Sequence, residues 1–327
     1  MASFRQRGGK WQARVLRNGY PDQTKTFETK VDAEKWARAL ESEIDKGQFV
    51  NVSEAQRTTL GDVIARYLAE VTPSMKGASE DTIRLKAIMR RPIARWSMVN
   101  LSAARIATYR DERLKEVSSG TVIRELAYLS AIINHARKEW GVNVPNPVQM
   151  VRKPPSPQAR SRVLTDEEAV RLLQALEPTG RRSHWTKPVV QLALATAMRR
   201  GELLSLRWEH VDLQNRTAFL PDTKNGDSRT VPLSTAAVQV LAELPRHISG
   251  VVFPLKTFTL DAAFKRGLRR AGLEGIRFHD LRRTAITRMA EKLPNVIELA
   301  AVSGHKSVMV LKRYYRPSAV ELAQKLG

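Results

Sequence analysis

The sequence predicts a mainly α fold with small β elements, in the α+β class. Three observations predict it: a short basic segment of alternating apolar and polar residues opens the chain, long stretches with helical periodicity follow, and a cluster of prolines divides those stretches in two. We therefore expect a module of β-sheet plus helix over residues 1–55, a helical domain over 58–145, a linker over 146–163 and a mixed domain over 164–327.

The charge of the chain indicates a polyanionic partner. Its 327 residues include 55 Lys and Arg against 33 Asp and Glu, a formal net charge of +22. Nucleic acid is the first candidate partner, and a ribosome-associated or merely basic protein is the alternative. Cysteine is absent, which excludes disulfides and thiolate metal sites and fits a reducing cytoplasm. Because no apolar run predicts a signal peptide or a membrane span, we expect a cytoplasmic, nucleoid-associated bacterial protein.

The first module is predicted from strand and turn signals. Trp11–Val15 and Thr24–Phe27 predict two strands around an Asn18–Gly19 turn, and Asp32 can cap a helix that runs to about Lys46. A basic sheet of this kind can lie in a DNA groove, and a small protein-docking module is the alternative. If the module binds DNA, its candidate contacts are Arg5, Arg7 and Arg14.

The second domain is predicted from apolar stripes at helical spacing. One stripe begins at Leu60, a second spans Ile83–Ile93, a third spans Ile106–Leu114, and the clearest runs over Thr121–Trp140. These faces are typical of a core rather than of a binding surface. The basic residues between them form either a solvated face or a DNA face, and the net charge favours the second. The candidates there are Arg90 and Arg91.

Prolines then interrupt the helical pattern. Five of them lie in the segment VPNPVQMVRKPPSPQ, and because proline is excluded from helix and strand interiors we expect an extended basic linker in which Lys153 contacts DNA. Beyond it, Thr165 and Glu168 form the capping-box pattern that begins a helix. The rest of this domain is expected to be mostly helical, with short strands at 216–220 and 228–232 around an Asn-Gly turn.

Four short segments of the last domain carry reactive side chains. They are TAMRRGE at 196–202, TKNGDSR at 223–229, FHDLRR at 278–283 and GHKSVMVLKRYY at 304–315. They supply arginines that match phosphate oxygens, a lysine acid, histidines and a phenol, and no acidic triad for a metal. Each residue alone has an ordinary structural explanation, but the set predicts phosphodiester chemistry without a metal or cofactor. The candidates are Arg199, Lys224, His279, Arg282, His305 and Tyr314, with Glu202 as a support for Arg199.

In this order the candidates resemble the active site of the tyrosine recombinase (phage integrase) family, which runs Arg, Lys, His-x-x-Arg, Gly-His, Tyr. The resemblance covers Thr58 to the C-terminus and is greatest to the shufflon-type DNA invertases, on stretches such as ATAMRRGELLSLRWEHVDL, PDTKNGDSRTVPLS and AAVSGHKSVMVLKRY. It implies that the helical domain is a core-binding domain and the last one a catalytic domain. The N-terminal segment is similar to the arm-type DNA-binding domain of phage integrases.

The resemblance implies a role for each candidate. Arg199 and Arg282 would clamp the non-bridging oxygens of the scissile phosphate. Lys224 would protonate the departing 5′ oxygen, and His279 would take the proton of the attacking tyrosine. His305 would donate a hydrogen bond to the phosphate.

The nucleophile implied by the resemblance is a tyrosine near the C-terminus. Tyr314 would attack phosphorus and form a 3′-phosphotyrosyl link, whose retained energy allows rejoining without ATP or metal. Its nine-residue spacing from His305 favours it over Tyr315, which would then be a neighbouring contact. Two residues depart from the family pattern, Arg283 where histidine is frequent and Ala197 where glycine is frequent. We expect packing or phosphate-contact roles for both, with Arg283 as a DNA contact.

The expected partner is double-stranded DNA at specific recombination sites. The resemblance implies a tetramer on DNA, joined by a C-terminal helix with apolar Val320, Leu322, Ala323 and Leu326, with accessory DNA-bending proteins as further partners. A helix that folds back onto its own domain is the alternative. The expected function is site-specific DNA recombination, by shufflon-type inversion or phage-type integration and excision. A type IB topoisomerase and a non-catalytic DNA-binding regulator are the alternatives; the arm-like module argues against the first, and the complete catalytic set against the second.

Overall fold

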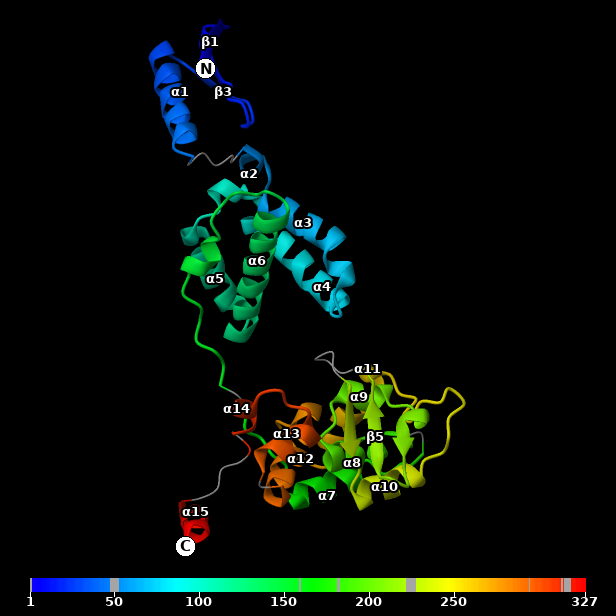
Figure 1. Cartoon of the computed structure of the whole chain (residues 1–327). Helices are drawn as coiled ribbons and strands as arrows, with labels where there is room; N and C mark the ends of the chain where they lie inside the picture. The colour runs from blue at the N-terminus through cyan, green and yellow to red at the C-terminus, as the bar shows by residue number, and fades with distance from the viewer. Residues whose placement is uncertain are drawn as a thin grey trace. The chain divides into compact units, whose positions relative to one another are not determined.

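The computed structural model describes residues 2–47, 53–158, 160–180, 183–221, 228–293, 295–312, 314 and 319–327. The chain divides into two compact units, Met1–Ala159 and Arg160–Gly327 (Figure 1). Within the described residues each unit is mainly helical and carries one three-stranded sheet, as the α+β class predicts. No helix in this part of the chain is long and apolar enough to cross a membrane.

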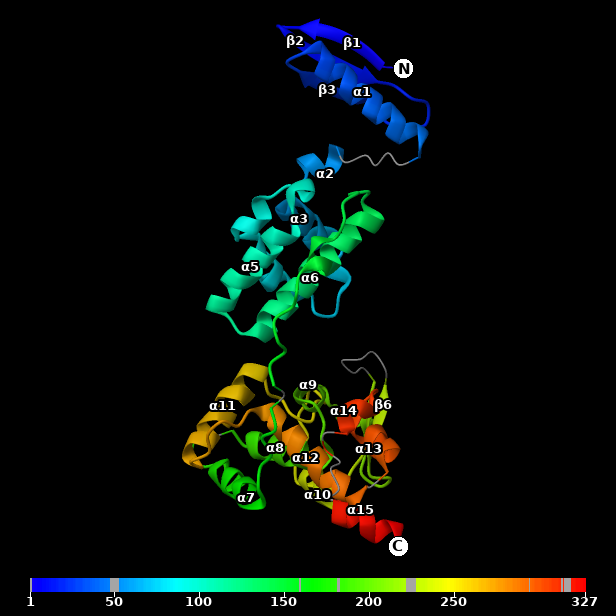
Figure 2. The same cartoon turned by 90° about the vertical axis from the view of Figure 1, so that its left-hand side faces the viewer.

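The N-terminal module is an antiparallel sheet with one helix against it (Figure 2). Its elements are β1 (Ala2–Arg7), β2 (Lys10–Val15), β3 (Gln23–Phe27) and α1 (Lys30–Asp45). The two predicted strands are confirmed as β2 and β3, whereas β1 was not predicted. Thr29 caps α1 and accepts a hydrogen bond from the backbone N–H of Asp32, so the prediction that Asp32 is the cap was wrong by one turn.

The rest of the first unit is a helical bundle around α6. Its helices are α2 (Ser53–Arg57), α3 (Leu60–Glu70), α4 (Ala78–Met89), α5 (Ala103–Glu116) and α6 (Ser119–Glu139), with short 3₁₀ segments at Thr72–Ser74, Pro92–Arg95, Met98–Asn100 and Pro147–Met150. The stripes of α3 and α6 are buried as predicted. The stripe of α4 is rotated, because Ile83 is 69% exposed while Leu85 and Ile88 are buried. In α5 the predicted Ile106 and Tyr109 are buried, but Arg113 rather than Leu114 completes the inward face.

The predicted linker 146–163 adjoins packed residues at both ends. At its start, Asn146 is buried and its amide Nδ2 donates hydrogen bonds to Ser130 and Asn134 on α6, which fixes the following 3₁₀ segment to the bundle. At its end, the backbone N–H of Leu164 donates to Oγ1 of Thr284 at 3.0 Å. The start of the predicted linker is thus packed against the bundle, and the residue that follows its end is packed into the second unit.

The second unit packs its helices around a central pair, α8 and α12. Its larger helices are α7 (Asp166–Ala175), α8 (Thr186–Thr196), α9 (Arg200–Ser205), α10 (Thr235–Ala242), α11 (Thr257–Arg270), α12 (Phe278–Lys292), α13 (Val296–Ser303), α14 (Val308–Leu311) and α15 (Ala319–Leu326), with a 3₁₀ segment at Trp208–His210. The sheet is β4 (Val211–Asp212), β5 (Thr217–Leu220) and β6 (Arg229–Pro232), in that order. The predicted capping box of α7 and the two predicted strands are confirmed.

Candidate active site

The ends of two helices meet around Arg282 of α12. Ala197 ends α8 in a left-handed conformation, with φ 55°, and its carbonyl oxygen accepts a hydrogen bond from Nη1 of Arg282. Nη2 of Arg282 donates to the carbonyl oxygen of Ser303 at the end of α13, at 2.6 Å. Glycine usually occupies such a backbone conformation, and the methyl group of Ala197 is instead buried in an apolar cluster with residues of α12 and α13. The buried guanidinium of Arg282 is thus held where α8, α12 and α13 converge.

A second arginine is held by a buried carboxylate. Arg199, just before α9, donates its backbone N–H and its Nη1 to the two carboxylate oxygens of Glu202, both at 2.7 Å. Glu202 is only 5% exposed and also accepts two hydrogen bonds, each 3.0 Å long, from Arg229 of β6. The contact predicted between Glu202 and Arg199 is present. Arg229 was missed, because the sequence places it 27 residues away with no local signal of the pairing.

The cluster of Arg199, Arg229, Arg282 and Glu202 carries more positive than negative charge. The guanidinium groups of Arg199 and Arg229 share the buried carboxylate of Glu202, and that of Arg282 is bound by two backbone carbonyl oxygens. Burial opposes ionisation of Glu202, but the backbone N–H of Arg199 and the charge of Arg229 outweigh it, so the pKa of Glu202 lies below its usual value. Burial and the charge of Arg199 lower the pKa of Arg282 to about 10, which leaves it cationic at neutral pH. Such a cluster favours a bound anion.

Two histidines border the cluster and are neutral at neutral pH. His279 lies in the first turn of α12, exposed on its outer side, and partial desolvation followed by the charge of Arg282 lowers its pKa. His305 follows Gly304, whose φ is 68°, and its Nδ1 lies 2.8 Å from Oγ of Ser303. Burial and the charges of Arg282 and Arg199 lower the pKa of His305 to about 4.

The candidate nucleophile lies beside the second of these histidines. The ring of Tyr314 is half-buried against α12–α14, and its centroid is 6.3 Å from that of the His305 ring. The guanidinium of Arg283 lies 5.6 Å from the Tyr314 ring centroid. Lys224 and Tyr315 lie outside the described residues. Of the predicted catalytic residues that the structure describes, all five are thus brought to one region of the second unit.

The other DNA-contact candidates belong to the first unit. Arg5, Arg7 and Arg14 lie on one face of the N-terminal sheet, by strand alternation, with α1 against the opposite face. Arg14 is paired with Asp22 at 2.7 Å, and Arg91 makes a bidentate ion pair with Glu116. Arg90 and Lys153 are exposed.

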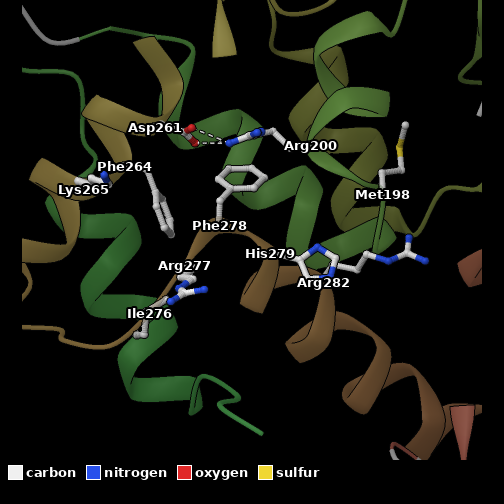
Figure 3. Close-up of a pocket in the computed structure, with 10 residues that line it drawn as sticks. All are labelled: Met198, Arg200, Asp261, Phe264, Lys265, Ile276, Arg277, Phe278, His279 and Arg282. Carbon is white, nitrogen blue, oxygen red and sulfur yellow. Dashed lines mark hydrogen bonds and ion pairs between the residues drawn. The ribbon is translucent and has the colours of Figure 1, made fainter. Parts of the chain in front are cut away.

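A cavity of about 350 Å³ adjoins the catalytic candidates (Figure 3). His279 and Arg282 line one end of it, and the rings of Phe264 and Phe278 pack edge to face inside it, with centroids 5.3 Å apart. At its far wall Arg200 forms an ion pair with Asp261. The remaining lining residues are Met198, Lys265, Ile276 and Arg277. The lining of the cavity thus adds Lys265 and Arg277 to the cationic residues near Arg282.

Comparison with known proteins gives consistent matches. Residues 162–321 match the sequence profile of the phage integrase family. The chain is 41% identical to a shufflon-specific DNA recombinase of Escherichia coli, over 83% of this chain and 72% of the relative. It is 36% identical to a putative integrase/recombinase of Haemophilus influenzae, over 98% of this chain and 89% of the relative.

Solved structures match the fold over nearly the whole chain. A lambda integrase dimer bound to a core site matches with a TM-score of 0.67 and 22% identity, over 96% of this chain and 94% of the other. A lambda integrase tetramer bound to a Holliday junction matches with a TM-score of 0.65 and 21% identity, over 93% and 95%.

Proposed function

We propose a reaction for this chain from the premise that it belongs to the phage integrase family and is a tyrosine-type site-specific recombinase. The substrate is double-stranded DNA at a defined site, and the reaction is cleavage and rejoining of its strands by transesterification. The single observation that carries the proposal is the convergence of Arg199, Arg282, His305 and Tyr314 from separate elements on one cationic cluster.

The chemistry follows from that convergence. Arg199 and Arg282 bind the non-bridging oxygens of the scissile phosphate and stabilise the charge that develops on them. Tyr314 attacks phosphorus, a bond forms between Oη and phosphorus, and the bond to the 5′ oxygen breaks. The phenolic proton passes to a neutral histidine, for which His279 is the candidate, and the 5′ oxygen takes a proton from Lys224. The 3′-phosphotyrosyl link then reacts with another 5′ hydroxyl, so no cofactor is consumed.

The rest of the molecule serves site recognition and assembly. Arg5, Arg7 and Arg14 contact the DNA backbone from the open sheet face, and Arg90, Arg91, Lys153 and Arg283 add further phosphate contacts. Val320 and Leu326 of α15 are largely exposed, which supports a role for that helix in joining protomers into a tetramer on DNA. The recombination outcome is inversion, by similarity to the shufflon-specific relative, with integration and excision as the second candidate. The reaction takes place in the bacterial cytoplasm, with accessory DNA-bending proteins as further partners.

The test is a nicked suicide substrate built on the repeats that adjoin the gene. Wild-type protein traps a denaturant-resistant adduct, because the nick lets the cleaved strand diffuse away. Tyr314→Phe binds the same DNA and forms no adduct, because only the nucleophilic oxygen is missing. Tyr315→Phe is the matched control and keeps at least a substantial part of the adduct.

The result identifies the class as well as the nucleophile. Loss of the adduct in Tyr315→Phe alone would move the nucleophile by one residue. Relaxation of supercoiled plasmids that lack the repeats would favour a topoisomerase. Tight DNA binding without an adduct for any of the three proteins would contradict the proposal that the chain is an enzyme.

A further inference from the structure

The hydrogen bonds of Ser303 determine which nitrogen of His305 carries a proton. The Ser303 hydroxyl donates its only proton to the carbonyl oxygen of Leu299, one turn earlier in α13, at 2.6 Å. The same oxygen lies 2.8 Å from Nδ1 of His305. Because a hydroxyl has one proton and a carbonyl oxygen has none to give, Oγ can only accept in its contact with the histidine. Nδ1 of His305 must therefore be the donor.

This tautomer affects how the histidine meets DNA. A neutral imidazole has one N–H, so a proton on Nδ1 leaves Nε2 with a lone pair. An unprotonated Nε2 cannot donate a hydrogen bond to a phosphate oxygen, and its lone pair is repelled by that oxygen. We propose, on the basis of the function above, that Ser303 fixes the Nδ1–H tautomer of His305, so that His305 holds the scissile phosphate only after it takes up a second proton on Nε2. Ser303 is then a positioning residue that couples DNA engagement to proton uptake.

The surroundings of His305 are arranged for such coupling. Arg199 and Arg229 approach it from α9 and β6, with Nη2 of Arg199 3.5 Å from the Gly304 carbonyl oxygen, and Arg282 and His279 face it from α12. Glu202 is committed to two of these arginines. Without DNA, the cations oppose a further positive charge on the ring. A phosphodiester bound among them supplies the negative charge that the imidazolium needs.

Ser303 is suited to this role by its burial. Its side chain is fully buried, and Arg282 holds its carbonyl oxygen, so neither the hydroxyl nor the backbone can turn to another partner without breaking a contact at the centre of the cluster. The tautomer is thus set by the fold before DNA binds.

The first test needs no DNA. In the full chain with ¹⁵N-labelled histidine, long-range ¹H–¹⁵N correlation spectra distinguish the two ring nitrogens, and the His305 signals are assigned by their loss in His305→Gln. Wild-type protein should show a protonated Nδ1 and an unprotonated Nε2. Ser303→Ala removes the acceptor of Nδ1–H and should convert a large share of the ring to the other tautomer. Observation of Nε2–H as the major tautomer of the wild type would overturn the proposal.

The second test measures protons taken up on binding. Calorimetric titration of the recombination site in buffers of different ionisation enthalpy should show uptake by the wild type near neutral pH. In both variants the uptake should fall by up to roughly one proton per protomer. In Ser303→Ala the neutral His305 ring can already donate from Nε2. In His305→Gln the amide donates without titrating. Equal uptake by all three proteins would refute the coupling.

A matched control separates this role from a structural one. Thr284 is another buried hydroxyl of this unit that donates back along its helix, to the carbonyl oxygen of Asp280 at 2.9 Å, with no histidine against it. Thr284→Ala should lower stability while leaving the tautomer and the proton uptake unchanged. If the wild type formed no adduct with any DNA, the proposed function would fail, whereas the tautomer measured in the free protein would still stand or fall by itself.

Discussion

Glu202 accepts hydrogen bonds from two arginines that lie on different elements, Arg199 before α9 and Arg229 in β6. The guanidinium of Arg229 also packs against Gly304, where an added Cβ would lie 2.4 Å from its Nη1. Arg229 therefore links α9, the sheet and the turn that carries His305. We expect it to act on catalysis through Glu202 and Gly304 rather than by contact with the reacting atoms.

Loss of Arg229 should slow DNA cleavage more than it weakens DNA binding. In Arg229→Ala the buried Glu202 loses one of two cations, Arg199 turns toward it more fully, and the rate of adduct formation should fall by about 10²-fold. The rate of adduct formation in Glu202→Gln should fall by a similar factor. Because both changes break the same contact, the double variant should be little worse than either single one. The rates of adduct formation on the suicide substrate, measured for the wild type, both single variants and the double variant, complete this double-mutant cycle. Additive losses of rate would show that Arg229 acts independently of Glu202.

The control for that cycle is an ion pair on the surface. Arg207 contacts Glu209 at 2.5 Å, and both side chains are exposed. Arg207→Ala removes an equal charge from the same unit and should leave the cleavage rate within about twofold, as expected for a surface pair worth at most about 1 kcal/mol.

At this scale the sequence predicted the groups that act on phosphate but not those that hold them. The motifs single out Arg199, Arg282 and His305 because the type and order of reactive residues are visible in the chain. Arg229 and Ser303 are ordinary residue types, and their partners are defined only once β6 and α13 pack beside α9. Lys224 and Tyr315 lie outside the described residues, so the assignments for them stay predictions.

Helices α5 and α6 are joined by a buried ionic cluster. Glu125 of α6 accepts hydrogen bonds from Nε and Nη2 of Arg113 at 2.9 and 2.7 Å and from the Tyr109 hydroxyl at 2.8 Å. Burial and the neighbouring Glu125 raise the pKa of Tyr109 well above its usual value, so it remains a donor. The cluster joins the second half of α5 to the first half of α6, and Arg113 is only 9% exposed there.

Removal of the largely buried Glu125 carboxylate should destabilise the helical bundle. Glu125→Ala leaves Arg113 buried with only the exposed Glu116 as a partner, and the free energy of unfolding should fall by about 3 kcal/mol. Hydrogen exchange of the α5 and α6 amides in the full chain localises the effect to this bundle. Glu116→Ala is the control, since that carboxylate is half-exposed, and a loss above about 1 kcal/mol there would contradict the distinction drawn between the two.

The elements that were predicted correctly are those with a local signal. Thr165 and Glu168 specify the start of α7 within four residues, and the residues of α6 repeat their apolar stripe over five turns. β1 was missed because its outward face is polar and its inward face has only two apolar residues, Ala2 and Phe4. The rotated face of α4 depends on which neighbours the helix packs against. In α5 only the exchange of Leu114 for Arg113 was missed, because the inward position of Arg113 depends on its ion pair with Glu125 of α6.

The excess positive charge of the whole molecule is distributed over both units. In the second unit it converges on the cluster of Arg199, Arg229 and Arg282. In the first it includes the open face of the N-terminal sheet, where Arg14 pairs with Asp22 and Lys10 with Glu28. Arg5 and Arg7 of the same face are exposed.

The salt dependence of DNA binding tests whether that face contacts the backbone. Each phosphate contact releases condensed counterions, so the double variant Arg5→Ala, Arg7→Ala should reduce the slope of log affinity against log salt by about two. Lys35→Ala with Arg38→Ala removes the same charge from α1, which lies against the opposite face, and should reduce the slope much less. The comparison is made by titration of full-length protein onto DNA at several salt concentrations. If both pairs reduced the slope equally, only the net charge of the module would matter; if neither did, the module would not touch the DNA backbone and the protein-docking alternative would be favoured.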